Sequence, residues 1–138
     1  MKRTAKAIWN GSLKEGSGSI TTQSAVLQNT KYDFKSRFGD GKSTNPDELL
    51  AAAHAGCFAM ALSLILGEAG FTPDSLEVES VVTMDADKIE LTGSHLTLKA
   101  SIPKISHDKF MECANAAKEN CPVSKALRLP ITLDAALQ

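Results

Sequence analysis

The chain has 138 residues, of which 43% are hydrophobic and 22% charged, and its formal net charge at pH 7 is −1. This length suits one domain of ordinary size with its own core, so we expect a single domain over residues 1–138. With 5% aromatic residues and no run of basic residues, the composition argues against binding to nucleic acid or to a membrane surface.

The first third of the chain predicts three strands. Residues 5–10 and 20–28 have the composition of strands, and the segment between them, GSLKEGSG, predicts a turn. From residue 31 to residue 38 polar and aromatic residues alternate, which predicts a third strand with its aromatic side chains on one face. Arg37 would then project from the opposite, polar face, where a solvated charge is the ordinary interpretation.

A helix start follows the third predicted strand. Asn45 suits the N-cap, Pro46 suits the first helical position, and Glu48 follows Asn45 by three residues as in a capping box. The two carboxylates of this first turn, Asp47 and Glu48, have a structural explanation because they oppose the helix dipole.

The helix that begins there is apolar on every side. Between Leu49 and Leu66 only His54, Gly56 and Ser63 interrupt the apolar residues, so the helix is expected to be buried on all sides or to lie in lipid. Its length raises the possibility of a membrane span. Six alanines, a glycine and a histidine make it a weak span, and no second span follows. We therefore expect no membrane insertion and a helix buried in protein, shared between two chains.

The rest of the chain predicts two strands at residues 75–84 and 90–102, an amphipathic helix at 106–120, a short helix from Cys121–Pro122, and a closing strand at 131–137. Strands and helices are thus segregated rather than alternating along the chain. This order predicts the α+β class.

The three cysteines differ in the environment that the sequence predicts for them. No secretory signal precedes them, so a reducing compartment, the cytoplasm, is expected. Cys57 lies eleven residues past Pro46, too deep for the helix dipole to act, and burial would raise its pKa unless a cation lies nearby. Cys121 precedes Pro122 at a helix start, which makes it the more acidic thiol on local grounds. Cys113 has the spacing of a core residue.

Two plain interpretations compete with reactive thiols. A buried cysteine often serves only as a small hydrophobic residue. His54, Cys57 and Cys121 make a partial set of metal ligands, but no paired Cys or His spacing accompanies them, so no metal site is expected. His54 is more simply interpreted as a packed core histidine with a satisfied ring nitrogen.

Three segments together resemble a known family. The stretch TNPDELLAAAHAGCFAMALSLILGEAGF, the later CPVSKAL and the final ITLDAAL closely resemble the OsmC/Ohr family, and in particular its OsmC-type thiol peroxidases. The resemblance covers nearly the whole chain. It implies an α+β, OsmC-like fold assembled as an intertwined homodimer, with central buried helices wrapped by antiparallel β-sheets and active sites at the subunit interface.

The resemblance also implies a reaction. Members of the family reduce organic hydroperoxides, and hydrogen peroxide less well, without metal, haem or another cofactor. Cys57 would attack the peroxide and become a sulfenic acid, and Cys121 would condense with it to a disulfide. An external dithiol, which in Ohr-type relatives is a lipoylated protein, would then reduce that disulfide. Arg37 would activate Cys57 together with a carboxylate from the helix start.

One departure concerns that carboxylate, because the family usually has Glu where this chain has Asp47. On an ideal helix Asp47 lies roughly 80° and Glu48 roughly 180° from Cys57, so Asp47 has the better direction. The rise over ten residues is about 15 Å, too long for either to touch Cys57 along one straight helix. Either the first turn bends, Arg37 bridges the gap, or the carboxylate comes from a second chain. We hypothesise that Asp47 orients Arg37.

Two other functions would fit the same fold. One is a non-catalytic stress-adaptation protein in which Cys57 and Cys121 are merely buried. The other is a carrier of small hydrophobic ligands that uses the dimer pocket. The reactivity of the two thiols distinguishes the peroxidase from both.

Overall fold

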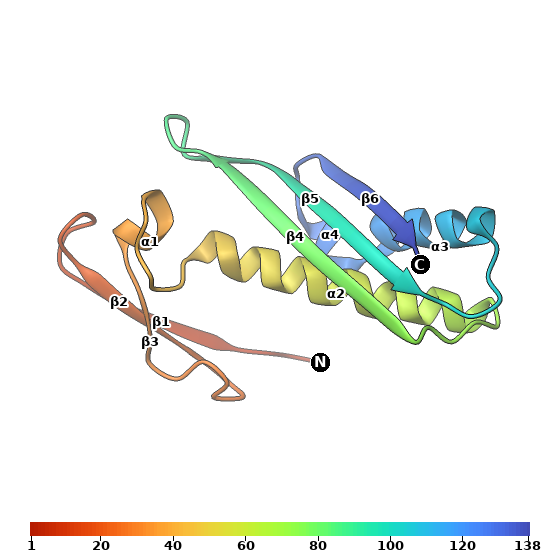
Figure 1. Cartoon of the computed structure of the whole chain (residues 1–138). Helices are drawn as coiled ribbons and strands as arrows, with labels where there is room; N and C mark the ends of the chain where they lie inside the picture. Colours follow the sequence, from red (N-terminus) through yellow and green to blue (C-terminus); the bar gives the residue numbers. More distant parts are fainter. The chain divides into compact units, whose positions relative to one another are not determined.

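A computed structural model describes all 138 residues, and the chain forms two compact units, Met1–Leu49 and Leu50–Gln138 (Figure 1). The elements confirm the predicted α+β class. That residues 1–138 act as a single domain stays a prediction.

The first unit contains an antiparallel sheet in the order β1-β2-β3, made of β1 (Ala5–Asn10), β2 (Ser17–Thr22) and β3 (Thr30–Tyr32). The turn after β1 needs glycine, since a Cβ on Gly16 would lie 2.3 Å from the carbonyl oxygen of Ser12. The second strand ends six residues earlier than predicted. Ala25 and Asn29 take positive φ angles of 60° and 48°, so the chain turns where the sequence pattern had suggested an extended segment.

The predicted strand at residues 31–38 is wrong beyond Tyr32. The chain forms a short helix, α1 (Phe34–Phe38), whose first turn is capped by the carboxylate of Asp33. Phe34 and Phe38 are aromatic neighbours one helical turn apart, with ring centroids 4.6 Å from each other. Residues four positions apart lie on one face of a strand and also on one face of a helix, so the spacing of the two phenylalanines fits both. The N-cap formed by Asp33 favours the helix. Arg37 therefore lies on a helix and not on a strand.

The long helix α2 (Pro46–Glu68) starts as predicted. The side-chain oxygen of Asn45 accepts a hydrogen bond of 2.9 Å from the backbone N–H of Glu48. The reciprocal half of a capping box does not form, because the Glu48 carboxylate accepts from the Thr44 hydroxyl at 2.9 Å instead. At the other end Gly70 has a φ of +86°, and the N–H of Phe71 bonds back to the carbonyl of Leu66 at 2.8 Å, which ends the helix.

The second unit has a sheet in the order β4-β5-β6, made of β4 (Ser75–Asp85), β5 (Glu90–Ser101) and β6 (Ile131–Leu137). β4 and β5 form an antiparallel hairpin, whereas β5 and β6 are parallel. The sheets are thus antiparallel, as expected, except for this one pair. A parallel pair needs a crossover connection. Here α3 (His107–Asn120) and α4 (Pro122–Ala126) lie between β5 and β6 in the chain.

The core of the second unit lies between one face of this sheet and the helices α2 and α3. Alternate residues of β5 turn inward and are fully buried, and so are Phe58, Leu62 and Leu66 along one side of α2. Phe110, Ala114 and Ala117 add the inner side of α3.

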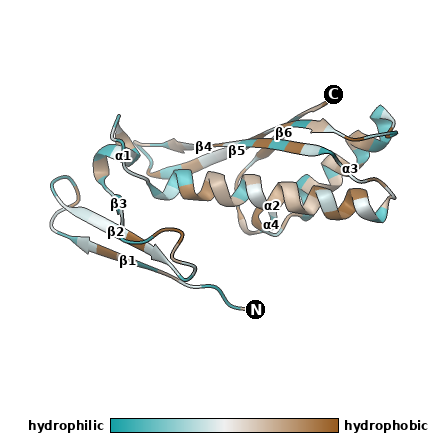
Figure 2. Cartoon of the chain, turned by 60° about the horizontal axis from the view of Figure 1, so that its bottom comes forward, coloured by the Kyte–Doolittle hydropathy of each residue, from teal (hydrophilic) through white to brown (hydrophobic).

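The opposite side of α2 is exposed, although the helix is apolar along most of its length (Figure 2). We call this side the exposed stripe; it comprises Ala52, Ala53, Gly56, Met60, Ser63, Leu64 and Gly67. Met60 and Leu64 are 76% and 65% exposed. The expectation of a helix buried on all sides is therefore not met within one chain. By length and composition alone, α2 is also apolar enough to cross a membrane.

Candidate functional site

Two cysteines of the second unit face each other. Cys57 lies on α2 beside the core residue Phe58, and Cys121 lies immediately before Pro122, at the start of α4. Both thiols are free, and each side chain lies close enough to the other to shift its pKa. They differ in exposure, because Cys57 is half-buried whereas Cys121 is 0% exposed.

The two thiols differ in pKa because their surroundings differ. Burial raises the pKa of Cys57, and its hydrogen bond to Cys121 raises that pKa further. Burial also acts to raise the pKa of Cys121, but the Cys57 thiol, the backbone N–H of Ser124 and the Ser124 hydroxyl outweigh it and lower that pKa. Within this unit the more acidic thiol is therefore Cys121, which agrees with the argument from its position at a helix start.

His54 sits one helical turn before Cys57 and is 0% exposed. Its Nδ1 lies 2.7 Å from the hydroxyl of Ser94, and its Nε2 lies 2.8 Å from the hydroxyl of Ser124. Burial lowers the pKa of His54, so its ring is neutral at pH 7. The prediction of a core histidine with a satisfied ring nitrogen is confirmed, and the structure adds a partner for the second nitrogen.

No group of three or more His, Cys, Asp or Glu side chains is placed to hold a metal ion. The third cysteine, Cys113, lies on α3 within the hydrophobic core, as its spacing predicted. Burial raises its pKa, so Cys113 has the environment of an unreactive thiol.

The charged candidates lie in the first unit, where Arg37 pairs with Asp47. The Arg37 Nε lies 3.4 Å from Asp47 Oδ2, and its Nη2 lies 3.2 Å from Oδ1. This two-point contact fixes the plane of the guanidinium group as well as its position. Both side chains are partly buried, at 32% and 14% exposure. Glu48, the other carboxylate considered, turns to Thr44 instead.

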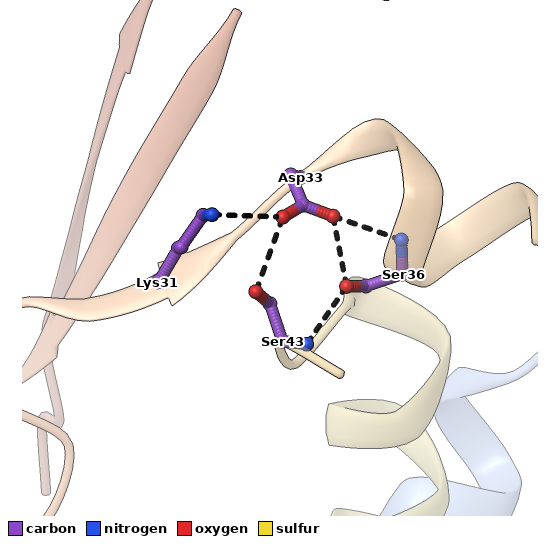
Figure 3. A network of polar contacts seen from close by, with 4 residues as sticks. All are labelled: Lys31, Asp33, Ser36 and Ser43. Carbon is purple, nitrogen blue, oxygen red and sulfur yellow. Dashed lines mark hydrogen bonds and ion pairs between the residues drawn. The ribbon is translucent and has the colours of Figure 1, made fainter. Parts of the chain in front are cut away.

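Asp33 holds the segment that carries Arg37 (Figure 3). Its Oδ1 accepts from the backbone N–H and the hydroxyl of Ser36 at 2.9 and 2.8 Å, and its Oδ2 accepts from the Ser43 hydroxyl at 3.1 Å. Lys31 completes the group, with its Nζ 3.5 Å from Oδ2. Hydrogen bonds from the Ser36 hydroxyl and N–H, then from Ser43, lower the pKa of Asp33 to about 2.

Sequence reasoning missed Asp33. The available signal was an aspartate followed three residues later by Ser36, a pattern typical of a helix N-cap. The aromatic alternation around it was interpreted as a strand, and that interpretation hid the cap.

A cavity of about 270 Å³ opens beside Arg37. Its wall is mostly apolar and aromatic, and it is formed entirely by residues of the first unit: Trp9, Leu13, Tyr32, Asp33, Phe34, Arg37, Phe38 and Pro46. Trp9 and Tyr32 pack against each other there, with ring centroids 5.4 Å apart. An apolar cavity with one cation in its wall suits a small organic molecule that has a polar end.

The five predicted site residues thus form two groups. Cys57 and Cys121 meet in the second unit, and Arg37 meets Asp47 in the first. Glu48 belongs to the helix cap and pairs with neither thiol nor guanidinium.

The chain is similar to known proteins over nearly its whole length. Residues 39–136 match the family described as OsmC-like protein. Peroxiredoxin OsmC of Escherichia coli is 43% identical over 138 residues, covering 99% of this chain and 96% of that one. Organic hydroperoxide resistance protein OhrB of Bacillus subtilis is 34% identical over 114 residues, covering 80% and 82%.

Solved structures have the same fold. The crystal structure of OhrB from Bacillus subtilis superposes with a TM-score of 0.65, at 28% identity and 98% coverage of both chains. An OsmC-like protein from Mycoplasma pneumoniae reaches a TM-score of 0.77 at 17% identity, covering 99% of this chain and 97% of that one.

The Asp33 group generates a pH prediction. Because its pKa in the folded protein lies below the ordinary value of 3.8, ionised Asp33 stabilises the fold above about pH 4, and this contribution is lost as the pH falls towards 2. In urea unfolding followed by the fluorescence of Trp9, the single tryptophan, Asp33→Asn should lower the midpoint at pH 7. The difference from wild type should vanish near pH 2.

Asp40→Asn is the matched control, since Asp40 is an exposed carboxylate of the following loop. It should leave the midpoint unchanged over this pH range. A gap between wild type and Asp33→Asn that stays constant down to pH 2 would show that the charge of Asp33 does not stabilise this unit.

Proposed function

Since the chain belongs to the OsmC-like family, we propose that it is a thiol-dependent peroxidase that reduces organic hydroperoxides through Cys57 and Cys121. The observation that carries this proposal is the contact between the two free thiols in one compact unit. The relatives described above include a peroxiredoxin and an organic hydroperoxide resistance protein, which supports the same chemistry.

Exposure supports Cys57 as the thiol that attacks the peroxide. Cys121 is fully buried, so a substrate arriving from solvent can reach only Cys57 of the pair. The acidity of the free pair favours the opposite charge distribution, with the proton on Cys57.

A cation is needed to favour the Cys57 thiolate, and Arg37 is the proposed source. A guanidinium group beside a thiolate stabilises the charged form, and it can also donate hydrogen bonds to a peroxide oxygen. The two-point contact with Asp47 holds the Arg37 group in one orientation. In this proposal the Arg37–Asp47 pair approaches Cys57 of the same chain or of a second copy.

The cavity beside Arg37 supports an organic substrate over hydrogen peroxide. Its volume of about 270 Å³ is close to the lower end of ligand pockets, roughly 300 Å³. The aromatic wall would hold the organic group and Arg37 would face the polar peroxide end.

The proposed reaction has two oxidative steps. The Cys57 thiolate attacks one peroxide oxygen, the O–O bond breaks, and the other oxygen leaves as an alkoxide that takes a proton to become the alcohol. Cys121 then attacks the Cys57 sulfenic sulfur, which forms the disulfide and releases the hydroxyl group as water. An external dithiol, which we propose to be of the lipoyl type, restores both thiols. This need for a reductant suits the cytoplasm.

We further propose that the active assembly is a homodimer in which a second copy covers the exposed stripe of α2. The stripe places Met60 and Leu64 in solvent at 76% and 65% exposure. Apolar residues that continue along one whole side of a long helix are typical of an interface.

The first experiment tests the reaction itself. Treatment of the reduced protein with a few equivalents of cumene hydroperoxide should lower its mass by two hydrogens, and peptide mapping should locate one disulfide between Cys57 and Cys121. Dihydrolipoamide should then restore both thiols. Unreacted thiols with no peroxide consumed would contradict the peroxidase and favour a non-catalytic protein or a hydrophobic-ligand carrier.

A second experiment separates the two carboxylates. Asp47→Asn should lower kcat/KM for cumene hydroperoxide by about 10- to 100-fold, because a misplaced guanidinium loses its alignment with the reacting atoms. Asp47→Glu, which restores the residue usual in the family, should stay active. The matched control Glu48→Gln should remain near wild type; its loss of activity together with an active Asp47→Asn would identify Glu48 as the carboxylate.

A third experiment tests the dimer. A Cβ added at Gly56 meets no atom within 4 Å in the single chain, so a leucine there disturbs only what covers the exposed stripe. Light scattering should give a dimeric mass for wild type and a monomeric mass for Gly56→Leu. Glu119→Leu, at an exposed position on α3, serves as the control and should stay dimeric. A Gly56→Leu dimer would exclude the stripe as the interface.

A further inference from the structure

Cys121 must exchange a proton without contact with solvent. In the cycle proposed above, on which this inference rests, Cys121 loses its proton when it attacks the sulfenic acid and regains one when the disulfide is reduced. Its side chain is 0% exposed. The proton therefore has to pass through protein groups.

A row of hydrogen-bonded side chains begins at Ser124, three residues after Cys121. The Ser124 hydroxyl, in the first turn of α4, lowers the pKa of the Cys121 thiol and lies 2.8 Å from His54 Nε2. His54 Nδ1 lies 2.7 Å from the Ser94 hydroxyl on β5, and this hydroxyl lies 3.2 Å from that of Ser80 on β4.

Three members of the row are buried, and the last is partly exposed. Ser124, His54 and Ser94 are 7%, 0% and 1% exposed, whereas Ser80 is only half-buried. No buried side-chain nitrogen or oxygen lacks a hydrogen-bond partner. The row thus leads from Ser124, beside the fully buried sulfur, to a partly exposed strand position at Ser80.

We propose that Ser124, His54 and Ser94 carry the proton of Cys121 during disulfide formation and reduction. His54 acts through Ser124 and is therefore a positioning residue. While Cys121 is a thiol, its S–H points to Ser124, whose own O–H donates to His54 Nε2, and the ring donates from Nδ1 to Ser94. When Cys121 is a thiolate, Ser124 donates to the sulfur and His54 donates from Nε2 to Ser124.

The step balances in atoms and electrons. The Cys121 proton passes to Ser124, which gives its own proton to His54 Nε2, and the Nδ1 proton leaves towards Ser94 and Ser80. The Cys121 sulfur supplies the electron pair of the new S–S bond, and the S–O bond of the Cys57 sulfenic acid breaks. The departing hydroxide takes a proton from solvent beside the half-exposed Cys57 and leaves as water.

A neutral ring suits this role, since a relay needs one nitrogen as donor and the other as acceptor. No charged side chain shifts the pKa of His54, which is lowered by burial alone. The groups that act on Cys121 are Cys57 from α2, and Ser124 and Val123 from α4.

The test is the rate of disulfide formation in a single turnover. Reduced protein is mixed with one equivalent of cumene hydroperoxide, quenched with an alkylating agent, and analysed by mass for sulfenic acid and disulfide. Glutamine can keep hydrogen bonds to both serines but cannot exchange protons as imidazole does. His54→Gln should therefore form the disulfide about 100-fold more slowly at pH 7, and the rate should recover as the pH rises.

His95→Gln is the matched control. His95 lies on β5 and bonds to Thr132 at 2.6 Å and to Asp134 at 3.2 Å, away from the row. It should react at the wild-type rate with a wild-type pH profile. A His54→Gln rate equal to wild type, or one lowered equally at every pH, would overturn the proposal.

A second measurement covers the case in which His54→Gln does not fold, and it does not depend on peroxidase activity. In a Cys57→Ser, Cys113→Ala background the thiolate absorbance reports the pKa of Cys121 alone. Ser124→Ala should raise this pKa by about one unit, because a hydrogen bond to the charged sulfur is lost, and Ser124→Thr should restore it. An unchanged pKa in Ser124→Ala would overturn the proposal. A wild-type protein that forms no disulfide would contradict the proposed function. The pKa of Cys121 would still show whether Ser124 interacts with its sulfur.

Discussion

The contact between Cys57 and Cys121 is the constraint on which the chemistry of this protein depends. The two residues are far apart in the chain, and three features of the second unit bring them together. The side of α2 that carries Phe58 packs into the core, the crossover between the parallel strands β5 and β6 includes α3, and α4 begins directly after Cys121. A disulfide needs its two sulfurs at close range, so these packing contacts set the conditions for the reaction.

The surroundings of the thiol pair give two chemically identical groups different exposure and different acidity. Cys121 is enclosed, and the neighbouring Cys57 and Ser124 lower its pKa. Cys57 is accessible but has no cation within its own unit, and burial raises its pKa. The accessible thiol is thus the one that needs help to ionise. In the reaction proposed above, Arg37 of the first unit supplies this help.

That charged group is held by local structure. The Asp33 carboxylate caps α1 and binds the loop that follows it, while Asn45 donates a hydrogen bond of 2.7 Å to the carbonyl of Ser36. Arg37 lies within this braced segment and Asp47 lies on the first turn of α2. A short helix of five residues would not hold an arginine by itself, since isolated helices of this length are unstable in water.

Local patterns in the sequence determined the elements and the kind of chemistry. The Asn45–Pro46 start of α2, the hairpin of β4 and β5, α3, the helix start at Cys121 and the core position of Cys113 all follow from capping, periodicity and turn residues that act over a few positions. Recognition of the family rested on motifs of the same local kind, and it named Cys57, Cys121 and Arg37 before any contact was known.

The Phe34–Phe38 segment was misjudged because its spacing fits two periods, and only the contacts of Asp33 with Ser36 and Ser43 decide between them. Tertiary structure alone decided that β6 runs parallel to β5 and that His54 joins Ser94 to Ser124. Each of these is a contact between distant segments, and no pattern within a segment specifies which distant side chain it meets.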